Sequence, residues 1–110
     1  MKMRLVYTLR AQQDLKNIYE YLAYSLHSPQ VARSMSSRLM QAAHSLEDMP
    51  ERNPLYREEP WRSQGIRFLP VKNYLVLYTV NKETNTVSIA RILYGGMDIS
   101  RQLEESTETE

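Results

Sequence analysis

Two apolar stripes of helical period follow one another almost without a break, and no other feature of the sequence limits the fold as strongly. The first begins after Thr8, a typical N-cap residue, and its members are Ala11, Leu15, Ile18, Leu22 and Leu26. The polar residues Asp14, Lys16, Asn17 and Glu20 fall outside this stripe. The second begins at Ser28-Pro29, where proline suits the first helical turn, and ends at Met49-Pro50. Two long helices with so short a link fold back on each other, so the sequence predicts an antiparallel helical hairpin.

Apolar segments of strand type surround this hairpin. A short one, MRLVYT, precedes it, and three follow Gly65: IRFLPV, YLVLYTV and TVSIARILY. Turn residues separate the last three, which predicts an antiparallel meander, and the nearly continuous apolar character of 74–80 predicts a central strand. The expected fold is α+β in the order β-α-α-β-β-β, with the hairpin on one face of the sheet and the other face open to a macromolecular partner.

Length and composition favour one small domain, which we assign to residues 1–103 of the 110. The segment 104–110 is acidic and is expected to be disordered. Four of the 13 acidic residues lie in that tail, which leaves 14 basic against nine acidic residues and favours an anionic partner. There is no cysteine, no signal-peptide pattern and no apolar run of membrane-spanning length, so we expect a soluble, cytoplasmic protein that does not bind membranes.

The sequence holds no glycine-rich phosphate loop, metal-ligand cluster or Ser-His-Asp pattern, so we expect no metal and no cofactor. Cleavage of RNA by its own 2′-hydroxyl needs a base, cations and an acid, and Glu59, Arg67, Arg91 and Tyr94 could supply them. The spacing of these four residues in the sequence does not show that they meet in the fold. Each of the last three is also explained as a structural strand residue, and Trp61 could either stack on a base or hold its loop to the core.

A second set of candidates belongs to binding. The region 50–65 has three prolines and no periodicity, so it reads as a loop, and it is basic. At the other end, Gly95 and Gly96 let the chain leave the sheet, and Asp98 can cap a short helical turn at 98–103. The candidate target-binding residues are Arg62, Arg67, Tyr94, Asp98 and Arg101.

The pieces TLRAQQDL with Ile18 and Tyr21, Pro29 and Ala32, Leu46 and Pro50, IRFLPVKNYLVLYTV, and ARILYGGMDI occur in an order that resembles the RelE/ParE superfamily of type II toxin–antitoxin toxins. The resemblance covers residues from about 4 to 103. It implies a growth-inhibiting toxin with a helical hairpin on a curved antiparallel sheet. It also implies a cognate antitoxin that wraps the toxin with helices or an extended segment.

The resemblance leaves two activities open. RelE-like members are ribosome-dependent mRNA endonucleases and usually carry an arginine where this chain has Leu75. The ending RILYGGMDI is more similar to that of ParE-like members, which poison DNA gyrase, with Tyr94 where histidine is common. We therefore expect a gyrase poison, with an mRNA endoribonuclease as the alternative because EEPW resembles a segment bearing the catalytic glutamate in some nucleases. An inactive homologue kept as a binding partner and a basic nucleic-acid-binding domain are the remaining readings.

Overall fold

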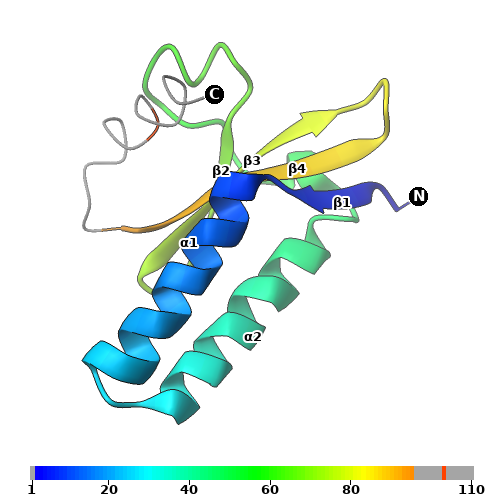
Figure 1. Cartoon of the computed structure of the whole chain (residues 1–110). Helices are drawn as coiled ribbons and strands as arrows, with labels where there is room; N and C mark the ends of the chain where they lie inside the picture. The colour runs from blue at the N-terminus through cyan, green and yellow to red at the C-terminus, as the bar shows by residue number, and fades with distance from the viewer. Residues whose placement is uncertain (1, 96–102, 104–110) are drawn as a thin grey trace.

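The computed structural model describes residues 2–95 and 103, and its elements follow the predicted order (Figure 1). The bounds are β1 Arg4–Tyr7, α1 Leu9–Glu20, α2 Pro29–Ser45, β2 Arg67–Val71, β3 Tyr74–Asn81 and β4 Thr86–Tyr94. A π-helical turn, Tyr21–Ser25, continues α1, and a 3-10 turn, Pro50–Arg52, follows α2. The α+β class and the helical hairpin are confirmed. In the part of the chain that is described, no helix is both long and apolar enough to cross a membrane.

The four strands form one sheet in the order β1-β4-β3-β2. β2, β3 and β4 make the predicted antiparallel meander, and β3 lies in the interior of the sheet as expected. β1 differs from the expectation, because it pairs with β4 in parallel, with Leu5 opposite Val87. A parallel pair needs a long connection, which the helical hairpin and two strands supply here. The sheet is therefore mixed and not antiparallel throughout.

Thr8 joins the start of α1 to the sheet. Its hydroxyl oxygen accepts a hydrogen bond from the backbone N–H of Ala11 at 3.1 Å, so the predicted N-cap is confirmed. The same hydroxyl donates to the carbonyl oxygen of Ala90 in β4 at 2.9 Å. Ser28 holds the corresponding position before α2, but its side chain makes no capping bond. One threonine thus fixes both where α1 begins and how it meets β4.

The link between the two helices departs from the predicted stripe at Leu26. In the π-helical turn the N–H of Leu26 bonds to the carbonyl oxygen of Tyr21, five residues back, at 3.0 Å. The wider turn rotates the residues that follow it relative to an α-helix. Leu22 stays buried against Ala32, whereas 53% of Leu26 is exposed. Leu26 therefore belongs to the surface of the hairpin and not to its core.

The hairpin packs on one face of the sheet and forms the larger core. Ala11 and Ala43 have no exposed surface and let backbones approach closely, and Leu39 and Leu46 fill the layer between α2 and the strands. Ala32 belongs to a smaller cluster within the hairpin, with Leu22 and Ala23. Complete burial of a leucine side chain contributes roughly 1.5–3 kcal/mol. The hairpin therefore gains its stability chiefly from this face and not from helix propensity.

The opposite face of the sheet is covered in part, which corrects the expectation of an open face. Trp61, Ile66, Leu77, Leu93 and Leu103 form a second cluster, called here the loop cluster, and each is at most 8% exposed. Leu77 and Leu93 come from β3 and β4, while Trp61 comes from the long loop before β2. Trp61 therefore holds its loop to the core, as one of its two expected roles required. β3 is covered on both faces, which explains its continuous apolar sequence.

Candidate functional site

A buried ion pair joins α1 to β4. Asp14 is 8% exposed and Arg91 is 5% exposed. The Nε and Nη2 atoms of Arg91 donate to the two carboxylate oxygens of Asp14 at 2.7 and 2.9 Å, and the backbone N–H of Ile92 donates to the same carboxylate at 2.9 Å. A bidentate pair with a third donor fixes both the distance and the orientation of the two elements.

This pair lies where the sheet loses its outer strand. β1 accompanies β4 only as far as the pairing of Tyr7 with Ile89. Beyond that point the hydroxyl of Thr8 bonds to the Ala90 carbonyl, and the carboxylate of Asp14 bonds to the Ile92 N–H. Side chains of the helix therefore take the place of a neighbouring strand along this part of β4. The Ala90 carbonyl and the Ile92 N–H are thus satisfied without β1.

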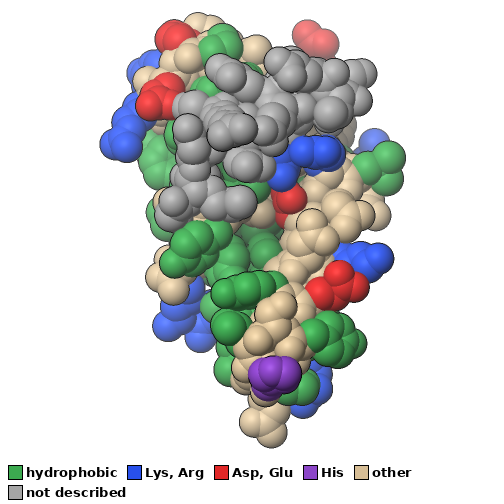
Figure 2. Space-filling view, turned by 60° about the vertical axis from the view of Figure 1, so that its left-hand side comes forward, with side chains coloured by type: hydrophobic (Ala, Val, Ile, Leu, Met, Phe, Trp, Pro, Cys, Tyr) green, Lys and Arg blue, Asp and Glu red, His purple; other side chains and the backbone are tan. Residues whose placement is uncertain are grey.

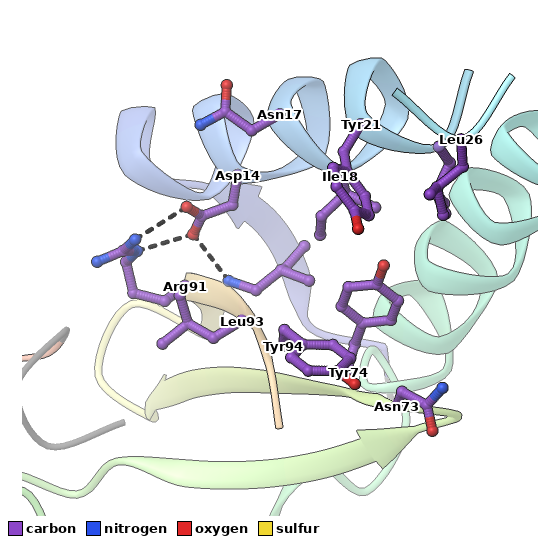
Figure 3. A pocket seen from close by; sticks show the side chains of 12 residues that line it. Asp14, Asn17, Ile18, Tyr21, Leu26, Asn73, Tyr74, Arg91, Leu93 and Tyr94 are labelled. Carbon is purple, nitrogen blue, oxygen red and sulfur yellow. Dashed lines mark hydrogen bonds and ion pairs between the residues drawn. The ribbon is translucent and has the colours of Figure 1, made fainter. Parts of the chain in front are cut away.

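Past the ion pair, α1 and the strand ends enclose a groove of about 710 Å³ (Figure 3). One wall comes from α1 and the turn after it, and the other comes from the ends of β3 and β4. The lining residues are Asp14, Asn17, Ile18, Tyr21, Leu22, Leu26, Asn73, Tyr74, Arg91, Ile92, Leu93 and Tyr94. The ion pair stands at one end, and three tyrosines face one another at the other (Figure 3).

The open end of the groove is apolar and accessible. Tyr21, Leu26 and Tyr94 are each between 50% and 54% exposed, although large apolar side chains are usually buried. The rings of Tyr74 and Tyr94 meet edge to face, with centroids 5.9 Å apart and an angle of 73°. Hydrophobic side chains gather on the face that Figure 2 brings forward, with Lys and Arg at its margins. Such a patch on a small domain suits a macromolecular partner.

The hydroxyl of Tyr74 is kept neutral. Burial raises its pKa above the ordinary value, and the neighbouring Tyr21 and Tyr94 hydroxyls act in the same direction. At neutral pH the Tyr74 hydroxyl is therefore uncharged, so it can accept or donate a hydrogen bond but supplies no charge.

Two of the predicted site residues, Arg91 and Tyr94, line the groove, but at different places. The guanidinium of Arg91 is bound by Asp14, whereas Tyr94 packs on Tyr74 at the strand end. The structural role considered for Tyr94, a half-buried aromatic that ends a strand, matches its position at the end of β4. The role considered for Arg91, a strand residue with its guanidinium at the rim of the sheet, does not match, because the guanidinium is buried against Asp14.

Glu59 lies on the exposed loop and is bonded within it. Its carboxylate accepts from the backbone N–H of Ser63 at 2.8 Å and from the Ser63 hydroxyl at 2.9 Å. The Ser63 hydroxyl, then the Ser63 N–H, and to a smaller degree Arg62 lower the pKa of Glu59. A lowered pKa makes a carboxylate a weaker base, whereas a general base at neutral pH needs a raised one.

Arg67 holds the loop to the sheet. Its Nη1 atom donates to the carbonyl oxygens of Asn53 at 2.6 Å and Glu51 at 3.3 Å, and Nη2 lies 3.8 Å from the Glu51 carboxylate. Arg62 is exposed in the loop. The two remaining candidates, Asp98 and Arg101, lie outside the described residues, as do Gly96 and the tail 104–110, and of the expected turn at 98–103 only Leu103 is described.

Sequence reasoning missed most of the groove. Asp14 falls outside the helical stripe, which marks a solvent-facing residue, yet it is buried because Arg91 lies opposite it. Tyr21 and Leu26 were assigned to the hairpin, and Asn73 and Tyr74 to a turn and a strand. The only indication in the sequence was that Asp14 and Tyr21 belong to the segment that resembles the first helix of the RelE/ParE superfamily. Within residues 2–95 and 103, no three His, Asp or Glu side chains are grouped so that they could hold a metal ion.

Comparison with known proteins identifies the family. The family model for the ParE toxin of the type II toxin–antitoxin system parDE matches residues 5–99. No curated protein sequence matches the chain.

Solved structures share the fold. A chain of the chromosomal ParDE system of P. aeruginosa has a TM-score of 0.69 and 22% identity, over 84% of this chain and 96% of its own. A chain of the Mycobacterium tuberculosis complex RelBE2 has a TM-score of 0.62 and 21% identity, over 86% of this chain and 92% of its own. A mutant of E. coli RelE in the free state has a TM-score of 0.66 and 15% identity, over 99% of this chain and 98% of its own. Since the family model spans most of the sequence, this chain belongs to the ParE toxin family and is a type II toxin of the RelE/ParE superfamily.

Proposed function

We propose that this ParE-family toxin inhibits growth by poisoning DNA gyrase, and that a cognate antitoxin neutralises it by occupying the groove between α1 and the ends of β3 and β4. The observation that carries the first part is the separation of Arg67 from Tyr94, two of the four residues suggested for a nuclease site. The observation that carries the second is the exposed aromatic end of the groove.

The sheet register keeps two of the four candidates, the cation Arg67 and the acid Tyr94, apart. Arg67 pairs with Tyr78 on β3, and Tyr94 pairs with Tyr74. These two β3 positions are four residues apart, or about 13 Å along the strand. A base and an acid acting on one phosphate must each come within hydrogen-bonding distance of it, with a cation beside them.

The cations are also engaged elsewhere. Asp14 holds Arg91, and loop carbonyls hold Arg67. Leu75, at the position where the resemblance implies an arginine, packs an apolar side chain against the loop cluster. A toxin that binds and traps a protein needs no such catalytic set, and this favours the gyrase hypothesis over the nuclease hypothesis.

The groove suits an antitoxin segment. Tyr21, Leu26 and Tyr94 offer half-exposed apolar surface that an amphipathic helix or an extended segment can cover. The chain outside its acidic tail carries 14 basic and nine acidic residues, which complements the acidic character common in antitoxin tails. A disordered segment that folds on binding can cover such a surface along its length.

Purified gyrase and translating ribosomes test the target. The toxin is expected to inhibit supercoiling of relaxed plasmid, while primer extension on translated mRNA shows no new ends. The matched variant Glu59→Gln should inhibit gyrase as well as the parent, because Glu59 bonds only to Ser63 among the residues described. Cuts within codons that disappear in Glu59→Gln, together with normal supercoiling, would replace the gyrase proposal with the endoribonuclease.

Co-expression tests the antitoxin. Induction of the toxin alone is expected to arrest growth with a DNA damage response, and the protein encoded by the neighbouring small open reading frame should restore growth. Arrest without DNA damage, or arrest that this protein does not relieve, would contradict the corresponding part of the proposal.

A further inference from the structure

The contact between α1 and β4 changes character along its length. At Asp14 the helix is bonded to both the side chain of Arg91 and the backbone of Ile92. Two turns further along the helix, Tyr21 faces the groove, and two residues further along the strand, Tyr94 does the same. The ion pair is thus the last polar connection described between these two elements before the groove opens.

We propose that Asp14 is a positioning residue: by holding Arg91 and the N–H of Ile92, it fixes the separation of α1 and β4 and with it the width of the groove. The antitoxin as occupant rests on the function proposed above, whereas the width of the groove is a property of the toxin alone. A small rotation of α1 about Asp14 moves Tyr21 and Leu26 relative to Tyr94, because they lie further from the fixed point.

The bonds of Asp14 fix the orientation of α1 relative to β4, which apolar packing alone does not do. Apolar contacts have no preferred direction, so a helix packed only by them can shift while it stays buried. The carboxylate accepts from a guanidinium fork and a strand N–H at once, and this arrangement admits one orientation. Replacement of a buried ion pair by apolar residues of similar volume often preserves or raises stability. Stability and positioning can therefore be separated by mutation.

Two variants make this separation. Asp14→Asn keeps the shape of the side chain but removes its charge and one acceptor oxygen. The double variant D14L/R91M replaces the pair with apolar side chains. It is expected to stay folded in buffer but to unfold at a somewhat lower urea concentration than the parent, because the N–H of Ile92 loses its acceptor. The control K82Q breaks the exposed pair of Lys82 with Glu51, whose atoms are 3.0 Å apart, away from the groove.

Because the chain has no cysteine, spin labels can be attached through E20C and N73C, one on each side of the groove. Pulsed electron paramagnetic resonance should give a single narrow distribution of the distance between the two labels in the parent and in K82Q. It should give broader or shifted distributions in Asp14→Asn and in D14L/R91M. A distribution in the folded double variant as narrow as that of the parent, and at the same distance, would overturn the positioning role.

Calorimetry with the full-length antitoxin encoded beside the toxin is the second readout. Both variants are expected to bind at least about tenfold more weakly than K82Q. Parental affinity together with parental distances in D14L/R91M would assign Asp14 a structural role only and overturn the proposal. Altered distances with unchanged affinity would support the positioning of the groove and overturn the groove as the antitoxin's site, so the two failures are distinguishable.

Discussion

The groove and the loop before β2 both carry residues that the sequence suggested for chemistry, but they use their side chains differently. In the loop, the carboxylate of Glu59 is bonded to Ser63, and the loop carbonyl of Asn53 is bonded to the guanidinium of Arg67 at the start of β2. At the open end of the groove, Tyr21 and Tyr94 leave half of their surface exposed. The loop uses its polar groups to hold its own shape, whereas the groove keeps apolar surface available to a partner.

The largest effect should come from removal of Trp61, because this side chain anchors the loop and is not part of the groove lining. Trp61→Ala deletes a side chain that is only 4% exposed and packs against Leu77 and Leu93. The free energy of unfolding, measured with urea, is expected to fall by about 3–5 kcal/mol. The affinity of the folded protein for antitoxin should stay at the parental value. An equal loss of affinity would show that the two regions are not independent.

Arg67→Met tests whether this arginine serves the fold or the chemistry. The variant keeps an unbranched side chain but removes the bonds to the Asn53 and Glu51 carbonyls. We expect urea unfolding to show a loss of about 1.5–3 kcal/mol, the range for hydrogen bonds to charged groups, with inhibition of gyrase by the folded protein retained. Unchanged stability together with lost mRNA cleavage would return Arg67 to a catalytic role.

Tyr21→Ala tests the groove, and Tyr24→Ala is its matched control. Both tyrosines are more than half exposed and lie in the same turn, but only Tyr21 lines the groove. Truncation of Tyr21 is expected to weaken antitoxin binding by at least about tenfold, or ~1.4 kcal/mol, as measured by calorimetry. Truncation of Tyr24 should change affinity little. Equal losses in the two variants would place the antitoxin on the hairpin tip and not in the groove.

The smallest effect concerns Tyr78, which ties the loop to the sheet. Its hydroxyl donates to the Pro50 carbonyl at 2.6 Å and accepts from the Asn53 amide at 3.0 Å, so Tyr78→Phe should cost about 1 kcal/mol at neutral pH. Burial raises the pKa of Tyr78 above its ordinary 10.0, although Asn53, Arg67 and Arg52 act in the opposite direction.

The sign of the pH effect follows from that raised pKa. The stability that the neutral hydroxyl contributes is complete below pH 10.0 and is lost as the pH rises through the folded-state pKa. The free energy of unfolding of the parent, measured with urea, should therefore be nearly constant from neutral pH to pH 10.0 and then fall. The fall should be shallower in Tyr78→Phe, with a remainder from Tyr7 and Tyr74, whose pKa values are also raised. An equally steep fall in the variant would contradict this assignment.

The sequence predicted what depends on neighbours along the chain. The cap at Thr8, the start of α2 at Pro29 and the three-stranded meander follow from local patterns, and the structure contains them. It did not predict that β1 pairs in parallel with β4, because the apolar period of a strand does not indicate which strand lies beside it. It did not predict the exposure of Leu26 either, because a π-helical turn has no distinct apolar period.

The candidate site was harder to predict for the same reason. Asp14 looks like a surface residue until Arg91, 77 positions later, is brought beside it. Residues of α1 and the strand ends make one groove only in three dimensions. Arg67 and Glu59 were suggested by residue type, but whether such groups are engaged within the protein depends on contacts that spacing does not reveal.

Hydrogen–deuterium exchange of the toxin with and without its antitoxin tests the central claim most directly. The account predicts that the strongest new protection falls on residues 17–26 and 72–75, the two walls of the groove, while residues 57–65 of the loop exchange as before. Protection centred on 57–65, with the walls of the groove unchanged, would contradict it.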